Sequence, residues 1–279
     1  MIYRTINFVL TDEESDLAAF NAAIALAEHS NGHLDVFCLG YDPVRYDMVP
    51  MGSAPALSLM ATGDAQIAAD RLAKWAEDRL KNVTFASSVR PLVINSVGLE
   101  STIARVVRFA DLVVVPQPYG NSATQLNVSV LEAALFGTSA PVLVVPKDAE
   151  NFCTFENPLV MWNESPESLG AIRNALPALE NADRTQIVMV DPPSHSPDRS
   201  DPGGAVTLML SRHGITAEVS ILSKTLPTVA DVINRYVNDH ENDLIVMGAY
   251  GHSRFREALI GGATRDMLEK SEVPIMMSH

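Results

Sequence analysis

The 279-residue chain has little cysteine, little positive charge and no long hydrophobic run. Its two cysteines, Cys38 and Cys153, form no C-x-x-C pair, so the sequence supports neither a disulfide framework nor a zinc site. Asp and Glu outnumber Lys and Arg by 34 to 20, and the formal net charge of -14 disfavours nucleic acid as a partner. No apolar run approaches the roughly 20 residues that cross a bilayer, and the N-terminus lacks a signal-peptide pattern. We therefore expect a soluble, cytoplasmic protein without a membrane partner.

Two stretches of the chain recur at almost the same spacing. Residues 111–115, Asp-Leu-Val-Val-Val, resemble residues 243–247, Asp-Leu-Ile-Val-Met, 132 residues later. The Pro-apolar pattern that begins at Pro141 recurs at Pro274, 133 residues later. The chain is therefore predicted to be a tandem of two repeats.

The first repeat carries extra residues. The segments around Asp12 and Asn163 are 151 residues apart, so the first repeat holds 19 additional residues before Asp111. The stretch 42–59, rich in Pro, Gly and Met, accounts for them. It is interpreted either as a flexible lid or partner surface, or as an ordinary surface insertion.

Each repeat alternates predicted strands with predicted helices. Short apolar runs indicate buried parallel strands, and longer stretches with apolar residues every three or four positions indicate helices with one buried face. The first helix is expected over 15–29 with Ser15 as its N-cap. Such alternation predicts an α/β fold, a parallel sheet covered by helices on both faces. We place one domain at 1–147 and another at 157–279. The predicted strands are 5–10, 34–39, 85–92, 112–115, 142–145, 159–162, 186–190, 217–222, 244–247 and 274–278, and the other helices are 61–80, 99–109, 128–135, 167–179, 206–212, 229–238 and one after 262.

The strand over 244–247 leads into two glycine segments that suit phosphate binding. Gly248 and Gly251 follow the strand, and Gly261 and Gly262 begin the next helix. Glycine lets the backbone approach a ligand, and the unpaired N–H groups and positive dipole at a helix N-terminus attract anions. His252 is either a further phosphate contact or an exposed loop residue. We therefore predict a phosphate cradle between these segments.

The pattern G-x-x-G-x9-G at Gly248, Gly251 and Gly261, between an apolar strand and a helix carrying Thr264, resembles the universal stress protein family. The resemblance spans nearly the whole chain, as in tandem members of that family. It implies two doubly wound five-stranded parallel sheets of strand order 3-2-1-4-5, an adenine nucleotide alpha hydrolase-like architecture. It also implies a regulatory protein of the stress response that binds ATP or AMP, with or without Mg²⁺, although some members bind no nucleotide.

This strand order places a ligand beyond the carboxyl ends of the first and fourth strands of a repeat, where the winding direction reverses. Asn163 departs from the Asp of the family and brings no negative charge. Gly262 departs from the Ser or Thr of the family, so a hydroxyl contact is lost unless Thr264 or Ser253 replaces it. The nucleotide-binding residues implied by the resemblance are Asn163, Val190, Gly248, Gly251, His252, Gly261, Gly262, Ala263 and Thr264.

The first repeat lacks the glycine cradle. It has Pro116 and Tyr119 in place of the first two glycines, and Val128 and Ser129 in place of the second pair. Proline removes an N–H donor, and the other side chains occupy space that phosphates need. Although Asp12 keeps the acidic residue of the family, we expect the first repeat to be a structural copy without nucleotide.

Catalytic and metal sites find little support. The loop 191–201 holds His and Asp groups that could bind metal, but its prolines favour a solvated loop. Neither a G-x-x-x-x-G-K-[ST] motif nor a G-x-G-x-x-G motif is present. Glu164 could act as a base beside Asn163, but a carboxylate that favours the N-terminus of a helix is the simpler interpretation. We predict no catalytic residue, no metal ligand and at most slow ATP hydrolysis.

Two functions stay open at this stage. One is a regulatory protein that ATP or AMP switches through the second repeat, and the other is a nucleotide-free interaction or scaffold protein of the same fold. The strand over 274–278 is apolar and would lie at a sheet edge, and such edges tend to be paired. The family pairs its last strands between domains, which implies a pseudo-dimer of the two repeats and leaves a homodimer open.

Overall fold

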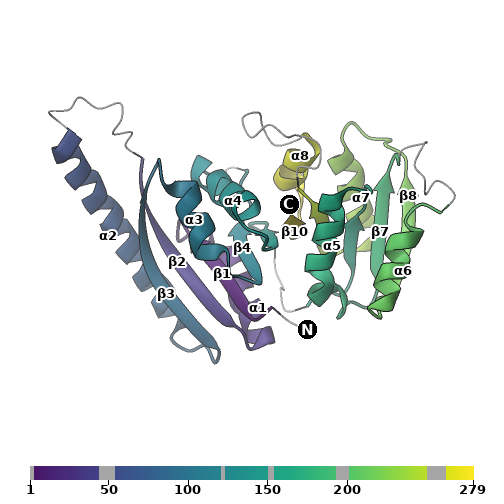
Figure 1. The fold of residues 1–279 in the computed structure, drawn as a ribbon, viewed down its shortest axis with the longest axis horizontal. Helices are drawn as coiled ribbons and strands as arrows, with labels where there is room; N and C mark the ends of the chain where they lie inside the picture. The colour runs from purple at the N-terminus through teal and green to yellow at the C-terminus, as the bar shows by residue number, and fades with distance from the viewer. Residues whose placement is uncertain (1–2, 44–53, 121–122, 150–153, 193–200, 250–261) are drawn as a thin grey trace. The chain divides into compact units, whose positions relative to one another are not determined.

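A computed structural model describes residues 3–43, 54–120, 123–149, 154–192, 201–249 and 262–279. The chain divides into two compact units (Figure 1). We call Tyr3–Ala140 the first unit, and Pro141–His279 together with Met1–Ile2 the second unit. Each unit alternates strands and helices around a largely parallel sheet, so the predicted α/β class is confirmed.

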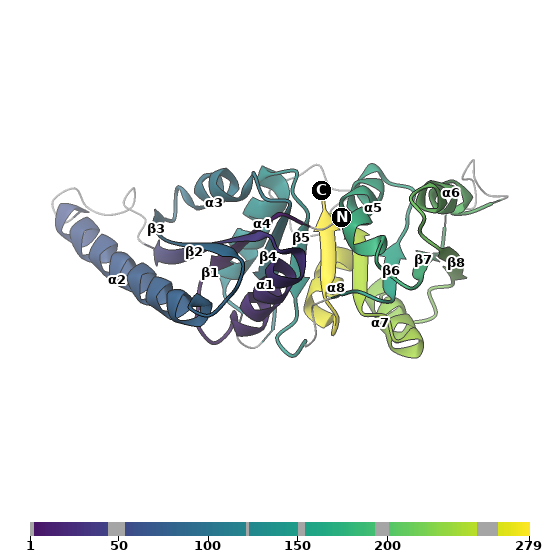
Figure 2. The same ribbon diagram turned by 90° about the horizontal axis from the view of Figure 1, so that it is seen from below.

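The first unit holds four parallel strands in the order β3-β2-β1-β4. Figure 2 shows α1 and α2 on one face of this sheet and α3 and α4 on the other. The aromatic ring of Phe20 packs against those of Phe8 and Trp75, with ring centroids 5.4 and 5.1 Å apart. The elements are β1 (Thr5–Leu10), α1 (Leu17–Ser30), β2 (His33–Asp42), α2 (Ala54–Leu80), β3 (Ala86–Asn95), α3 (Leu99–Val107), β4 (Leu112–Pro116) and α4 (Gln125–Gly137).

The second unit contains the order β8-β7-β6-β9-β10, which is the predicted 3-2-1-4-5 order of the second repeat. Helices α5 and α6 cover one face of its sheet, and α7 and α8 cover the other (Figure 2). The elements are β5 (Val142–Val145), β6 (Pro158–Met161), α5 (Pro166–Leu179), β7 (Thr185–Val190), α6 (Gly204–Arg212), β8 (Ala217–Leu222), α7 (Val229–His240), β9 (Leu244–Gly248), α8 (Gly262–Lys270) and β10 (Ile275–Ser278).

The last predicted strand of the first repeat, β5, falls in the second unit. It pairs antiparallel with β10, with Ile275 opposite Val144 and Met277 opposite Val142, while β10 pairs in parallel with β9 on its other side. The terminal strand is therefore paired along both edges, as its apolar sequence predicted. This pairing explains why the compact units divide after Ala140 and not between residues 147 and 157, where the two predicted domains were separated.

Three predicted helix starts are wrong, and one of them is that of α4, which begins at Gln125 and not at Val128. Helix α1 begins at Leu17 with Asp16 as its N-cap, and not at Ser15, because the Ser15 hydroxyl donates to Asp16 Oδ1 instead of capping. Helix α2 begins at Ala54, seven residues before the expected position. Part of the predicted insertion 42–59 is therefore an extension of this helix. Residues 44–53 of the insertion lie outside the described part of the chain.

Each repeat has an aspartate whose carboxylate binds the backbone at the start of that repeat's first strand. Asp111 Oδ2 accepts hydrogen bonds from the backbone N–H groups of Arg4 and Thr5, both at 2.9 Å. The carboxylate of Asp243, 132 residues later, accepts from the N–H groups of Glu156 and Asn157 at 2.6 and 3.1 Å. The structural equivalence explains the recurring Asp-Leu pattern that revealed the repeat.

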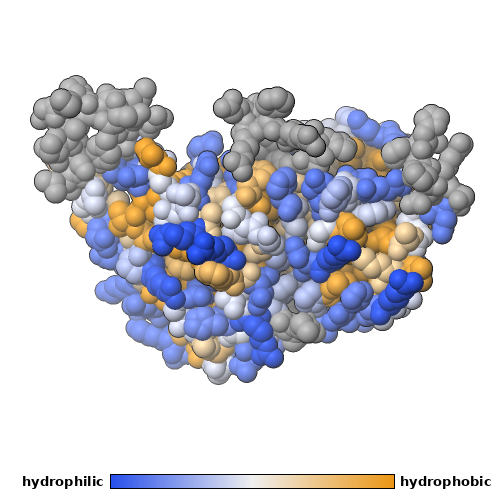
Figure 3. Space-filling view, viewed as in Figure 1, coloured by the Kyte–Doolittle hydropathy of each residue, from blue (hydrophilic) through white to orange (hydrophobic). Residues whose placement is uncertain are grey.

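The described surface mixes hydrophilic and hydrophobic side chains, and Figure 3 shows hydrophobic residues dispersed among hydrophilic ones. The large hydrophobic side chains that are exposed lie on several elements, and isolated residues of this kind are normal on a soluble fold. They are Met60, Ile67, Val97, Phe109, Leu208 and Ile221. Among the described residues, no helix combines the length and apolarity needed to span a membrane.

Candidate functional site

Three neighbouring strands of the second unit end at the same edge of the sheet. Strand β6 pairs in parallel with β7 on one side and with β9 on the other, with Val160 opposite Ile187 and Val246. Val190 and Gly248 are the last residues of β7 and β9, and Asn163 follows β6 by two positions. The fold therefore brings these three predicted site residues to one carboxyl edge, at the point where the chain reverses its winding direction.

The loop between β6 and α5 is shaped by local hydrogen bonds. Asn163 is exposed, and its Oδ1 accepts from the backbone N–H of Ser165 at 3.2 Å. Glu164 has a φ of 61°, a left-handed conformation that a residue with a side chain adopts rarely. Ser165 caps α5 by accepting from the N–H of Ser168 at 3.1 Å, and Pro166 occupies the first turn. The loop thus presents Asn163 at the edge and starts α5 beside it.

Gly248 allows β9 and α5 to approach closely. A Cβ atom at this position would lie 2.5 Å from the backbone N of Ser168 and 2.6 Å from the backbone C of Glu167. Ordinary contacts of a Cβ atom begin near 3.4 Å, and both neighbours are backbone atoms that cannot rotate away. Close packing against α5 is therefore sufficient to explain glycine at position 248.

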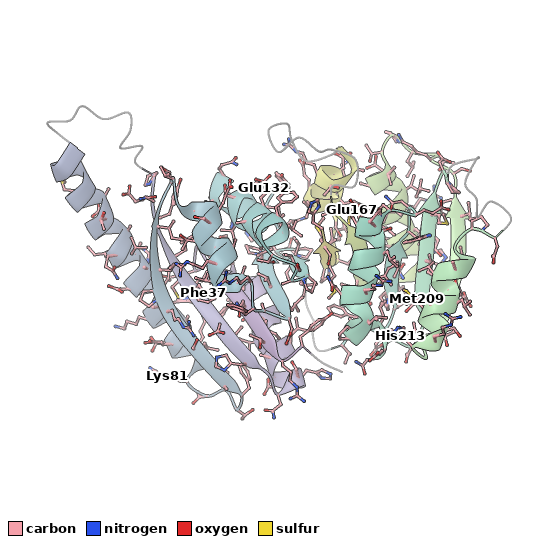
Figure 4. All side chains as sticks on the ribbon, viewed as in Figure 1. Phe37, Lys81, Glu132, Glu167, Met209 and His213 are labelled. Carbon is pink, nitrogen blue, oxygen red and sulfur yellow. The ribbon has the colours of Figure 1, made fainter. Side chains whose placement is uncertain are left out.

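Glu167 is a residue of this edge that the sequence did not single out. Its backbone contacts the Gly248 position, and the side chain of Glu167 is labelled in Figure 4 near the start of α5. Its Oε2 atom is buried and has no hydrogen-bond partner within the described structure. A carboxylate in the first turn is favourable for the helix dipole. Burying a carboxylate oxygen without a hydrogen-bond donor is unfavourable, however, so this atom calls for an explanation.

The second glycine segment leads into helix α8. Gly262, its first residue, is exposed, and a Cβ atom there would have no heavy atom of the described residues within 4 Å. Ala263 is also exposed, whereas Thr264 is buried at 7% exposure. The start of α8 therefore leaves room above its backbone, which is the condition for an anion to approach the N–H groups of the first turn.

Three of the predicted site residues, Gly251, His252 and Gly261, lie outside the described residues, as does Ser253. The described residues therefore include six of the nine predicted positions: Asn163, Val190 and Gly248 at the edge of the sheet, and Gly262, Ala263 and Thr264 at the start of α8.

Next to Val190, the chain turns sharply at Asp191, which has a φ of 45°. The N–H of Asp191 donates to the carbonyl of Leu222 at 2.9 Å, and its Oδ1 accepts from the N–H of Lys224 at 3.3 Å. This side chain therefore fastens β7 to the segment after β8. Across the residues with assigned positions, no group of three or more His, Cys, Asp or Glu side chains is placed to hold a metal ion.

The corresponding edge of the first unit is held together by side chains. Asp16 Oδ2 accepts from the N–H and the hydroxyl of Thr11 at 2.6 and 2.9 Å, and from the N–H of Asp12 at 3.1 Å. The Thr11 hydroxyl in turn accepts from Asn127 Nδ2 at 3.3 Å, while Asn127 Oδ1 accepts from the N–H of Thr124 at 2.8 Å. These bonds connect the end of β1 to the starts of α1 and α4.

The ionisation of this network follows from its bonds. Burial raises the pKa of Asp16 above its ordinary value, although the donors from Thr11, Asp12 and Ser15 act in the opposite direction. Backbone donation from Ser15 and Glu14 lowers the pKa of Asp12. Asp12, which the resemblance would place on a ligand, thus already accepts two local hydrogen bonds.

Comparison with known proteins finds similarity in the second repeat. Residues 155–279 match the model of the universal stress protein family. A universal stress protein of Synechocystis sp. is 33% identical over 90 residues, a segment that makes up 32% of this chain and 30% of that relative.

Two solved structures share the fold of nearly the whole chain. A universal stress protein from Archaeoglobus fulgidus superimposes with a TM-score of 0.64 and 16% identity, covering 98% of this chain and 95% of the other. A structure described as a putative universal stress protein from Pseudomonas aeruginosa gives a TM-score of 0.61 and 15% identity, covering 99% and 93%. The chain therefore has a universal stress protein-like fold throughout, and its residues 155–279 match the universal stress protein family by sequence.

Proposed function

We propose that the second unit binds an adenine nucleotide, ATP or AMP, at the carboxyl edge formed by β7, β6 and β9, and that the bound nucleotide regulates the protein. Open parallel sheets bind ligands at the edge where the winding direction reverses, which here lies between β6 and β9. Asn163 offers amide groups for a base or ribose, and Val190 offers an apolar wall. The start of α8 offers N–H groups for phosphate.

The observation that carries this proposal is the open surface at Gly262. This residue begins α8 and is exposed, and within the described part of the chain no heavy atom lies within 4 Å of the position where its Cβ would stand. In the first unit, Asn127 in the first turn of α4 donates to Thr11 after β1. Among the described residues, nothing stands beside Gly262 to oppose a phosphate there, while in the first unit side chains link α4 to the end of β1.

The groups at the edge are suited to binding more than to turnover. They are backbone amides, the Asn163 amide and carboxylates, which position a ligand through hydrogen bonds and charge. Hydrolysis of ATP would also require a positioned water and a base aligned with it. We accordingly propose a binding protein that changes its interactions with other molecules when nucleotide is bound, a population shift between two states.

The second candidate is a nucleotide-free interaction protein of the same fold. One observation favours it. Gly248 is explained by its contact with Glu167 and Ser168 on α5, so this glycine does not need a ligand to account for it. Homodimerisation and a pseudo-dimer of the repeats stay predictions under either function.

Calorimetric titration with ATP and Mg²⁺, and with AMP, tests the proposal on the full chain. Substituting Gly262 by Asp places a negative charge at the start of α8, where it favours the helix dipole but repels phosphate. We expect saturable binding by the wild type, a loss of about tenfold or more in affinity for Gly262→Asp, and a change of at most about threefold for the neutral control Gly262→Asn. Absence of saturation at millimolar nucleotide would refute nucleotide binding, and equal affinities of Gly262→Asp and Gly262→Asn would move the site away from α8.

A further inference from the structure

We propose that the outward face of helix α2 is a docking surface for a second copy of this chain, and that the two helices pair in antiparallel orientation about Ile67. The inference concerns the first unit and goes beyond nucleotide binding by the second. Its starting point is a pair of hydrophobic side chains, Met60 and Ile67, each 69% exposed. They are seven residues apart on α2, about two turns of an α-helix, so both lie on the same face.

This face points away from the sheet of the first unit. Ala65 and Ala69 are buried, and a Cβ atom on Gly40 of β2 would contact both of them. Ile67 lies midway between these alanines in the sequence, which places it about 200° around the helix from Ala65. Figures 1 and 2 show α2 running along β2 and β3. The helix therefore packs one stripe of side chains against its own sheet and presents the opposite stripe to solvent.

The outward face is narrow between the two apolar side chains. Gly63 lies there and is exposed, and a Cβ atom at this position would have no heavy atom of the described residues within 4 Å. Glycine within a helix is unfavourable relative to alanine, and packing within the described part of the chain does not account for it here. A position without a side chain lets the backbone of a second helix approach closely.

The charges of α2 balance, although the whole chain carries a formal net charge of -14. A second copy that approaches along this helix therefore meets a surface without net repulsion. The exposed charged residues between Met60 and Lys81 are the acidic Asp64, Asp70, Glu77 and Asp78 and the basic Arg71, Lys74, Arg79 and Lys81.

The charges next to Ile67 are complementary to themselves in an antiparallel pair. Asp64 lies three residues before Ile67, and Arg71 lies three residues after Ala68. A two-fold axis between Ile67 and Ala68 therefore sets Asp64 of each helix opposite Arg71 of the other, and the two Ile67 side chains meet at the centre. The Nε atom of Arg71 lies 3.1 Å from Oε1 of Glu13, an exposed ion pair that holds the guanidinium at this surface. A parallel pair would instead bring like charges together.

Sedimentation equilibrium of the full chain, from about 5 µM to about 500 µM, tests the docking surface. Two apolar anchors and two ion pairs make an interface of the weak, transient class, so we expect the average mass of the wild type to rise from that of one chain toward that of two across this range. Ile67→Glu should weaken dimerisation about tenfold or more, because it places two carboxylates at the centre of the interface. The matched control is Leu208→Glu, which makes the same change at a 54% exposed leucine on helix α6 and should alter dimerisation by less than about twofold.

Charge reversal tests the antiparallel register. Asp64→Arg alone and Arg71→Asp alone each bring like charges together twice, and each should weaken dimerisation several-fold. In an equal mixture, each variant carries the charge that the other lacks, so the mixture should dimerise several-fold more tightly than either variant alone.

A wild type that remains monomeric across the range overturns the proposal and leaves this face to solvent or to a different protein. A dimer that Ile67→Glu and Leu208→Glu affect equally also overturns it, because the contact would then lie elsewhere on the chain. A mixture of the two charge variants that binds no more tightly than its components refutes the antiparallel register. Circular dichroism at the lowest concentration confirms that each variant keeps the α/β fold, since every substituted side chain is exposed.

Discussion

Replacing Gly248 by Ala should destabilise the second unit even though the change adds one methyl group. The new Cβ would lie 2.5 Å from Ser168 N and 2.6 Å from Glu167 C, about 1 Å inside an ordinary contact. Because both neighbours are backbone atoms, α5 has to move relative to β9. Overpacking of this kind lowers the free energy of unfolding by about 2–3 kcal/mol. With a urea m value of about 2 kcal/mol/M, the midpoint of unfolding falls by about 1–1.5 M.

The matched control is Gly262→Ala, which adds the same methyl group where no heavy atom lies within 4 Å. This substitution should change the free energy of unfolding by at most about 0.5 kcal/mol. Both variants are made with Trp75 replaced by Phe, so that Trp162, at the end of β6, is the single tryptophan and reports unfolding of the second unit by fluorescence. Equal midpoints for Gly248→Ala and Gly262→Ala would show that β9 and α5 do not require glycine at position 248.

Two further predictions concern the first unit. Because burial raises the pKa of Asp16, the folded state holds this proton more tightly than the unfolded chain, and the resulting stabilisation is present below the ordinary value of 3.8 and lost as the pH rises through the raised pKa. The free energy of unfolding of the wild type minus that of Asp16→Asn should therefore fall with pH across that window in urea titrations, and a constant difference would contradict the assignment. Asn127→Ala removes the acceptor for Thr124 N–H and the donor to Thr11, and should lower the stability of the first unit by about 1–2 kcal/mol, measured through Trp75 fluorescence with Trp162 replaced by Phe. An unchanged midpoint would show that the link between α4 and β1 is not stabilising.

The positions of the strands were predictable because buried parallel strands have short apolar runs of sequence, which are uncommon in other elements. The strands Thr5–Leu10, Val142–Val145 and Ala217–Leu222 were predicted to the residue. Helix starts were less predictable, since several residues can cap a helix. Ser15 and Asp16 are both good N-cap types, and the choice between them depends on the hydrogen bonds of Asp16 to Thr11, which is not part of the helix.

The sequence predicted which strand ends meet at one edge, since Asn163, Val190 and Gly248 lie there, but not the role of each residue. The glycine spacing indicated the edge after β9. It could not distinguish a glycine that leaves space for a ligand from a glycine that lets a helix pack closely against the strand. The distances to neighbouring atoms place Gly248 in the second kind, whereas we propose Gly262, which has no described heavy atom near its Cβ position, as one of the first kind. Glu167 escaped notice for a similar reason, because an acidic residue in the first helical turn is ordinary and its unpartnered oxygen is a property of packing.

The two units give different solutions to the same structural problem. In each, the end of the first strand and the start of the last helix meet at the switch point, where polar backbone groups need partners. In the first unit, Asn127 and Asp16 supply those partners through Thr11, so a ligand there would have to displace bonds that the protein already makes. In the second, no heavy atom of the described residues lies within 4 Å of the Cβ position of Gly262. We therefore expect a phosphate to bind at the start of α8, where its oxygens would accept from the N–H groups of the first helical turn, and not at the first edge.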